Sequence, residues 1–164
     1  MAIRPTQASS YDNVRRGLNI NFFKLIRARH LLLAEAGIDV VPSDVSVEGG
    51  AALVVSGPNA GGKTVALKTL GLSALMLRAG LPIPAASGSV LGVVEIVLSD
   101  VGDDQSLSKN LSTFSAHVKN LARILEETRP GALVLLDEIA TGTDPREGEA
   151  LAAGVLDSLV RRGG

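Results

Sequence analysis

The 164-residue sequence contains no cysteine and no tryptophan, and aromatic residues make up only 2% of it. The absence of cysteine excludes disulfide bonds and thiolate-ligated metal sites, although it does not fix the cellular compartment. Few aromatics argue against a stacking platform for single-stranded nucleic acid. The formal net charge of −1 argues against a surface that grips duplex DNA by itself, because such surfaces are strongly basic.

The sequence also lacks an apolar run of the roughly 20 residues that a membrane-spanning helix needs. Its first residues, Met1 to Pro5, contain no apolar signal core, so we expect a cytoplasmic protein with no membrane partner. What the sequence does have is 46% hydrophobic residues and a mean hydropathy of +0.29. In a chain of this length, that composition predicts one globular domain with a substantial core.

The clearest motif is a glycine-rich stretch that fits the phosphate-binding pattern G-x-x-x-x-G-K-[ST]. It runs Gly57-Pro58-Asn59-Ala60-Gly61-Gly62-Lys63-Thr64. We expect a short buried strand before it, at 51–56, and a helix after it, at 64–77. Glycines let backbone N–H groups approach phosphate oxygens, Lys63 would reach the β- and γ-phosphates, and the Thr64 hydroxyl would bind Mg²⁺. The pattern therefore predicts an ATP or ADP site; the alternative is a glycine turn that matches by chance.

A second motif consists of the apolar residues 133–136 followed by two acids, Asp137 and Glu138. It resembles a Walker B motif, in which a buried strand ends in carboxylates. We assign Asp137 to Mg²⁺ and Glu138 to the general base that polarises the attacking water. The alternative is a core strand that ends in solvated acids, an interpretation that a neighbouring P-loop makes less attractive.

The rest of the sequence alternates between strand and helix patterns, which predicts an α/β fold. Residues 22–33 and 38–47 suggest a small β-layer ahead of the nucleotide core, and 93–98 another strand. Residues 101–110 are polar and suggest a loop. A helix to about Thr128 would follow, capped by Ser112 or Thr113, and a last helix would span 145–162. His30 is read as a structural hydrogen-bonding residue rather than a ligand.

Several of these segments resemble the ATPase domain of MutS proteins, ABC-type ATPases of DNA mismatch repair and recombination control. Those that carry the resemblance are the P-loop, the pair Arg29-His30, and the runs Leu111-Ser112-Thr113-Phe114-Ser115 and Asp137-Glu138-Ile139-Ala140-Thr141-Gly142-Thr143-Asp144. The sequence is most similar to the second bacterial branch, the MutS-two type, through 64–69, Ile83-Pro84-Ala85, 111–117 and 142–145. The resemblance covers residues 27–164 and leaves 1–26 as a poorly patterned N-terminal segment.

This resemblance implies a P-loop NTPase fold with an ABC-ATPase-like sheet flanked by helices, and Mg²⁺-dependent hydrolysis of ATP to ADP. It also implies a homodimer in which each nucleotide lies between the P-loop of one domain and the 111–115 segment of the other. Ser112 would then contact the γ-phosphate in trans, and Asn59 would lie near the γ-phosphate or the attacking water. Thr141, Gly142, Thr143 and Asp144 would cross the dimer interface. Other domains of the parent protein would bind DNA.

One departure from the family concerns a catalytic histidine, which the family places in a Thr-His context after the helix that ends near Arg162. The chain does not contain it, so we expect an incomplete ATPase domain with weak or no turnover alone. Two alternatives stay open. The chain could be another ABC-type ATPase, SMC-like or from a transporter, although Leu-Ser-Thr-Phe-Ser replaces the usual Leu-Ser-Gly-Gly-Gln-like run. It could also be a nucleotide-binding module without turnover.

Overall fold

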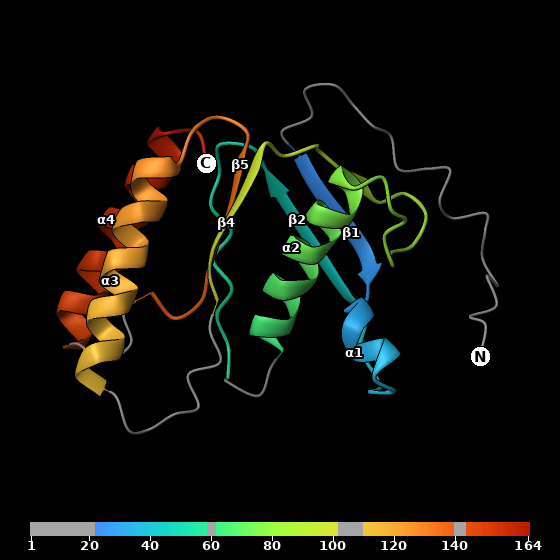
Figure 1. Ribbon diagram of the computed structural model, residues 1–164, viewed down its shortest axis with the longest axis horizontal. Coiled ribbons are helices and arrows are strands. Elements are labelled where there is room, and N and C mark those ends of the chain that lie inside the picture. Colours follow the sequence, from blue (N-terminus) through green and yellow to red (C-terminus); the bar gives the residue numbers. More distant parts are fainter. Residues whose placement is uncertain (1–21, 59–61, 102–109, 140–143) are drawn as a thin grey trace.

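A computed structural model describes residues 22–58, 62–101, 110–139 and 144–164 of the chain (Figure 1). For residues 110–114 it describes the backbone alone. The elements are β1 (Phe22–Ala28), α1 (Leu31–Glu35), β2 (Ser43–Glu48), α2 (Lys63–Arg78), β3 (Val90–Leu91), β4 (Ile96–Asp100), α3 (Asn110–Glu127), β5 (Ala132–Leu136) and α4 (Pro145–Arg161). The chain is therefore α/β, as its alternating patterns predict.

The elements form layers around α2 (Figure 1). An antiparallel sheet of order β2-β1-β3 lies on one side of α2, the parallel pair β4-β5 lies on the other, and α3 and α4 cover the far face of that pair. Two cores fill the spaces between layers. The core around α2 includes Phe23, Leu25, Leu70, Ala74, Leu77, Leu91, Leu133 and Leu135. The core under α3 and α4 includes Leu98, Leu121, Ile124, Val155 and Leu159.

The first sheet forms within the expected β-segment 22–33, but its strand ends at Ala28 and the helix α1 takes up the end of that segment. Phe23 and Leu25 point into the core, and a register irregularity between Leu25 and Ala28 then turns Ala28 inward as well. β2 begins only at Ser43, so the strand expected over 38–47 occupies just the second half of that range. The short β3 was not expected, and it forms because its two residues pair with Phe23 and Lys24 of β1.

α2 closely matches the helix expected over 64–77, and it packs tightly against the parallel pair. The contact is closest at Gly71, where an added Cβ would lie 2.6 Å from Leu135 Cδ1. Glycine weakens a helix interior, so its presence at this position reflects the short distance to β5. This close packing of α2 on β5 fixes the position of the helix relative to the strand.

β4 and β5 run parallel with Asp100 opposite Leu136, so their carboxyl ends meet at one edge of the sheet. β5 confirms the strand expected before Asp137. α4 confirms the last expected helix, and Asp144 caps it by accepting a hydrogen bond from the Arg146 backbone at 2.9 Å. The expected cap of the preceding helix is wrong, because α3 begins at Asn110 and both Ser112 and Thr113 already lie inside it.

The strand expected at 51–56 is also wrong. These residues are extended but exposed, with Leu53, Val54 and Val55 exposed by 49%, 71% and 49%. They line one side of a groove, and β5 lines the opposite side. Within the described residues, no strand pairing joins residues 51–56 to β5 across this groove. An apolar run becomes a strand only when a neighbour supplies its hydrogen bonds. None of the helices in the described residues is long and apolar enough to cross a membrane.

Candidate nucleotide site

The candidate site begins at the amino end of α2, directly after the glycine-rich stretch. Gly62 precedes the helix in a left-handed conformation, with φ +77°, which glycine adopts without strain. No side chain caps this end, and no acidic residue lies in its first turn. The first N–H groups of a helix have no partner within it and carry the positive end of the helix dipole, so such an end suits an anion.

Lys63 is the first residue of α2, and its side chain folds back over the loop that precedes it. The Lys63 Nζ donates hydrogen bonds to the carbonyl oxygens of Gly57 at 2.7 Å and Pro58 at 2.9 Å. The ammonium group is therefore held at the mouth of the loop, next to the helix N-terminus. A positive charge in this place adds to the attraction for phosphate.

Thr64 and Asp137 are brought together although they lie 73 positions apart in the chain. The Thr64 hydroxyl donates a hydrogen bond of 2.6 Å to Asp137 Oδ2. Asp137 in turn donates its backbone N–H to the carbonyl oxygen of Asp100 at 3.0 Å, which continues the β4-β5 ladder by one residue. A hydroxyl and a carboxylate are hard oxygen donors of the kind that Mg²⁺ prefers, so this pair fits the predicted metal role.

Glu138 follows Asp137 in an unusual backbone conformation. Its φ is +50°, a left-handed value that few residues other than glycine adopt, and its side chain is exposed. Arg27 is the other described non-glycine residue with a positive φ, and it lies in the β1 irregularity, where its N–H is bonded to Asp44. Glu138 has no strand irregularity beside it. It lies in the bend by which the chain leaves the sheet directly after β5.

One cavity of about 730 Å³ connects these residues. Lys63, Asp137 and Glu138 all line it, so the loop lysine and both acids face a common space. Most of the remaining lining is apolar and belongs to the groove between residues 51–55 and β5. The polar end of the cavity is the part that the sequence predicts to hold phosphate.

Several predicted site residues cannot be placed. Asn59, Ala60, Gly61, Thr141, Gly142 and Thr143 lie outside the described residues, as does the Ser112 side chain. His30, read as structural, is buried at the start of α1, where its Nδ1 accepts the Leu33 N–H at 3.4 Å. Within the described residues, no group of three or more histidine, cysteine or acidic side chains could hold a metal on its own.

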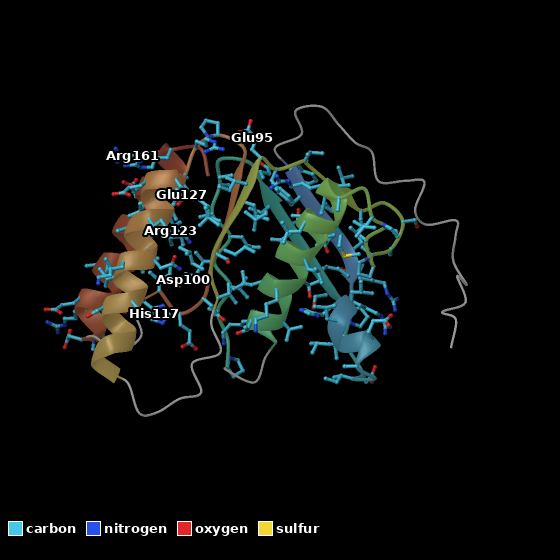
Figure 2. The ribbon with its side chains drawn as sticks, viewed as in Figure 1. Glu95, Asp100, His117, Arg123, Glu127 and Arg161 are labelled. Carbon is cyan, nitrogen blue, oxygen red and sulfur yellow. The ribbon has the colours of Figure 1, made fainter. Side chains whose placement is uncertain are left out.

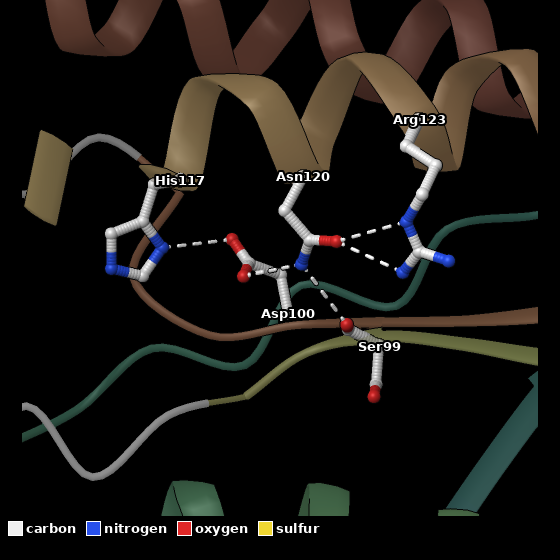
Figure 3. Close-up of polar contacts among 5 residues, drawn as sticks. All are labelled: Ser99, Asp100, His117, Asn120 and Arg123. Atoms are coloured by element: carbon white, nitrogen blue, oxygen red, sulfur yellow. Dashed lines mark hydrogen bonds and ion pairs between the residues drawn. The ribbon is translucent and has the colours of Figure 1, made fainter. Parts of the chain in front are cut away.

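The sequence reasoning missed a polar cluster beside Asp137 (Figures 2 and 3). Asp100, the last residue of β4, bonds through Oδ2 to His117 Nδ1 at 3.0 Å and through Oδ1 to Asn120 Nδ2 at 2.7 Å. Both partners come from α3. The available signal was a strand ending in an acid, followed by a helix with polar residues three positions apart.

Comparison with known proteins shows the family of the chain. The model of the family described as MutS domain V matches residues 53–163, and the chain belongs to that family. Its curated relatives include "Endonuclease MutS2" of Anaeromyxobacter sp. (strain Fw109-5), which is 52% identical over 160 residues, 97% of this chain and 20% of that protein. "Endonuclease MutS2" of Aquifex aeolicus (strain VF5) is 50% identical over 139 residues, covering 85% of this chain and 18% of that protein.

These comparisons confirm the resemblance to the second MutS branch. The chain spans about a fifth of the length of the relatives it matches. The alignment with the Anaeromyxobacter protein covers 160 residues, which is more than residues 27–164 contain. The similarity therefore extends into the first 26 residues, where the motifs alone indicated little.

Proposed function

We propose that this chain is the ATP-binding and hydrolysing part of a MutS-type protein that acts on DNA. The observation that carries the proposal is the 2.6 Å hydrogen bond between Thr64 and Asp137. It joins the residue after the P-loop lysine to the acid after β5, beside an uncapped helix N-terminus. Two sequence motifs, each of which predicts a nucleotide site without the other, are thus in direct contact.

Each residue has a role in this proposal. Lys63 and the N–H groups at the start of α2 bind the phosphates of ATP. Thr64 and Asp137 hold Mg²⁺, which offsets phosphate charge during transfer. Glu138 accepts a proton from the water that attacks the γ-phosphate, so that ATP and water give ADP and phosphate. The left-handed φ of Glu138 supports this assignment, since strained backbone clusters at functional sites.

The whole protein would use this chain as its motor. The relatives named endonuclease are about five times longer than this chain, and we place nuclease action and DNA contact in other parts of such a protein. Two copies of the ATPase domain would close on ATP, with Ser112 of one meeting the nucleotide of the other and 141–144 at the interface. The proposed location is the cytoplasm, where DNA and ATP are available in bacteria.

Isothermal titration calorimetry with Mg–ATP and Mg–ADP tests nucleotide binding. Lys63→Ala removes the ammonium group at the loop, and we expect it to weaken binding by about 2 kcal/mol or more, as loss of a charged hydrogen bond does. Lys24→Ala, an exposed lysine on β1, is the matched control and should bind as the parent does. Equal ATP affinity in the parent and Lys63→Ala would overturn the proposed site.

A further inference from the structure

The polar cluster of Asp100, His117 and Asn120 lies ahead of the apolar contacts that the structure describes for α3. In the part of α3 whose side chains are described, the first buried apolar residue is Leu121, and Val118 is 41% exposed. Leu121 and Ile124 then pack on the parallel pair and hold the second half of the helix. Ahead of Leu121, the described contacts between α3 and the sheet are polar ones, from His117 and Asn120 to Asp100 and Ser99.

These polar contacts have well-defined geometry (Figure 3). Each oxygen of the Asp100 carboxylate has its own partner on α3, at 3.0 Å and 2.7 Å, and Asn120 also donates to the Ser99 carbonyl at 3.3 Å. An ionised carboxylate only accepts, so His117 Nδ1 carries the hydrogen in this contact. Arg123 donates to the Asn120 Oδ1 at 3.0 Å and fixes the orientation of the amide. The side chains of Asp100 and His117 are 12% and 28% exposed, so water competes weakly for these bonds.

The cluster also connects directly to the candidate nucleotide site. Thr64 donates to Asp137, and Asp137 donates its N–H to the carbonyl oxygen of Asp100. The Asp100 carboxylate then bonds to His117 and Asn120. Hydrogen bonds through the side chains and backbones of Asp137 and Asp100 therefore link the start of α2, across the carboxyl ends of β5 and β4, to α3.

α3 continues for about two turns before His117, or roughly 10 Å at 1.5 Å per residue, back to its start at Asn110. We propose that Asp100, His117 and Asn120 position these first turns of α3 on the sheet and couple them to the nucleotide site. The coupling rests on the proposed function, while the positioning does not. His117 and Asn120 are positioning residues, because they hold the start of the helix, with Ser112, in place by bonding to Asp100. Asp100 in turn lies beside Asp137, the acid proposed to hold Mg²⁺.

Hydrogen–deuterium exchange read by mass spectrometry on this chain tests both statements. Without nucleotide, His117→Ala should speed amide exchange in residues 111–118 about tenfold, the size expected for losing one such bond. Exchange in 121–127 should stay within about twofold, because Leu121 and Ile124 still pack. His117→Asn, whose amide nitrogen lies near the position of Nδ1, should restore most of the protection. Lys119→Ala, an exposed residue of the same helix, is the matched control.

The nucleotide arm repeats the exchange with saturating Mg–ATP. In the parent, ATP should slow exchange in 111–118, and His117→Ala should lose most of that effect while its calorimetric ATP affinity stays within about threefold of the parent. Equal exchange in His117→Ala and Lys119→Ala, or equal acceleration of both halves of α3, would overturn the positioning. Binding of ATP without any effect on 111–118 in the parent would overturn the coupling alone. Absence of ATP binding would overturn the proposed function and the coupling with it, and the nucleotide-free arm would still decide the positioning.

Discussion

At the scale of single residues, Glu138 shows how a local conformation can support a chemical role. A residue with a Cβ at φ +50° costs on the order of 1 kcal/mol or more, and the surrounding structure must impose that conformation. Arg27 shows that a positive φ alone does not indicate function, because it accompanies a strand irregularity. At Glu138 the same strain lies one residue after Asp137 and on the wall of the cavity that Lys63 shares. This location, rather than the positive φ alone, supports a functional role for Glu138.

Glu138→Gln separates binding from chemistry. The amide keeps the size of the side chain and a hydrogen-bonding oxygen but cannot accept a proton. We therefore expect ATP affinity to change little and hydrolysis to fall by about 10²-fold or more, the usual contribution of a positioned base. Because we expect weak or no turnover from this chain alone, the measurement is steady-state hydrolysis by the full-length parent protein, beside calorimetry on the same samples.

The matched control for this change is Glu126→Gln, an exposed acid on α3. It should hydrolyse ATP at the parent rate. If Glu138→Gln also keeps the parent rate, the general base lies elsewhere and the assignment of Glu138 is wrong.

At the scale of elements, the sequence predicts helices better than strands because helical hydrogen bonds are local. α2 and α4 appear within a residue or two of their expected bounds, and β5 appears where four apolar residues precede Asp137. The run 51–56 has the same apolar character as β5 but no paired strand in the described residues. β3 is the opposite case: its two apolar residues are too few to predict a strand, yet they pair with β1. Pairing partners are distant in sequence, and composition does not reveal them.

Two glycines inside helices offer a matched test of element packing. Gly154 in α4 has nothing within 4 Å of an added Cβ, so Gly154→Ala should raise the free energy of unfolding by about 0.5–1 kcal/mol through helix propensity. Gly71 in α2 would place its Cβ 2.6 Å from buried Leu135. There, Gly71→Ala should lower the free energy of unfolding by about 1 kcal/mol, since overpacking exceeds the gain in propensity.

Urea unfolding followed by circular dichroism measures both changes against the parent. Each glycine serves as the control for the other, because the substitution is identical and only the surroundings differ. Stabilisation of equal size at both positions would show that α2 does not approach β5 as closely as described.

At the scale of the whole molecule, the candidate site divides into parts that the sequence reveals and parts that it does not. Lys63, Thr64, Asp137 and Glu138 are predictable because phosphate chemistry fixes residue types at short spacings. The contact between Thr64 and Asp137 follows once the start of α2 lies beside the carboxyl end of β5. The bonds from Asp100 to His117 and Asn120 depend instead on how α3 crosses β4, and no local pattern encodes that crossing. Polar clusters of this kind become visible only when the layers are assembled.

The charge of the whole chain leads to a final prediction about DNA. Non-specific affinity for duplex DNA comes mainly from lysines and arginines that neutralise phosphates and release counterions. This chain has 16 basic and 17 acidic residues and a net charge of −1. Several of its arginines are already paired with acids: Arg123 with Glu127, Arg129 with Glu95, and Arg161 with Asp157. We therefore expect this chain to bind DNA more weakly than a dissociation constant of about 10⁻⁴ M at physiological salt, the weak end of non-specific binding.

Fluorescence anisotropy with a labelled 30-base-pair duplex (about three helical turns) measures this affinity at 50 mM and at 200 mM salt. Separate titrations with Mg–ATP and without nucleotide cover the possibility that pairing creates a basic surface from two copies. Binding should be weak in every condition, because doubling a chain of charge −1 adds no net positive charge. Micromolar affinity that falls by about 10³-fold or more between the two salt concentrations would indicate six or more phosphate contacts. That result would show a basic face on this chain and would place DNA contact in the ATPase domain itself rather than in other parts of the protein.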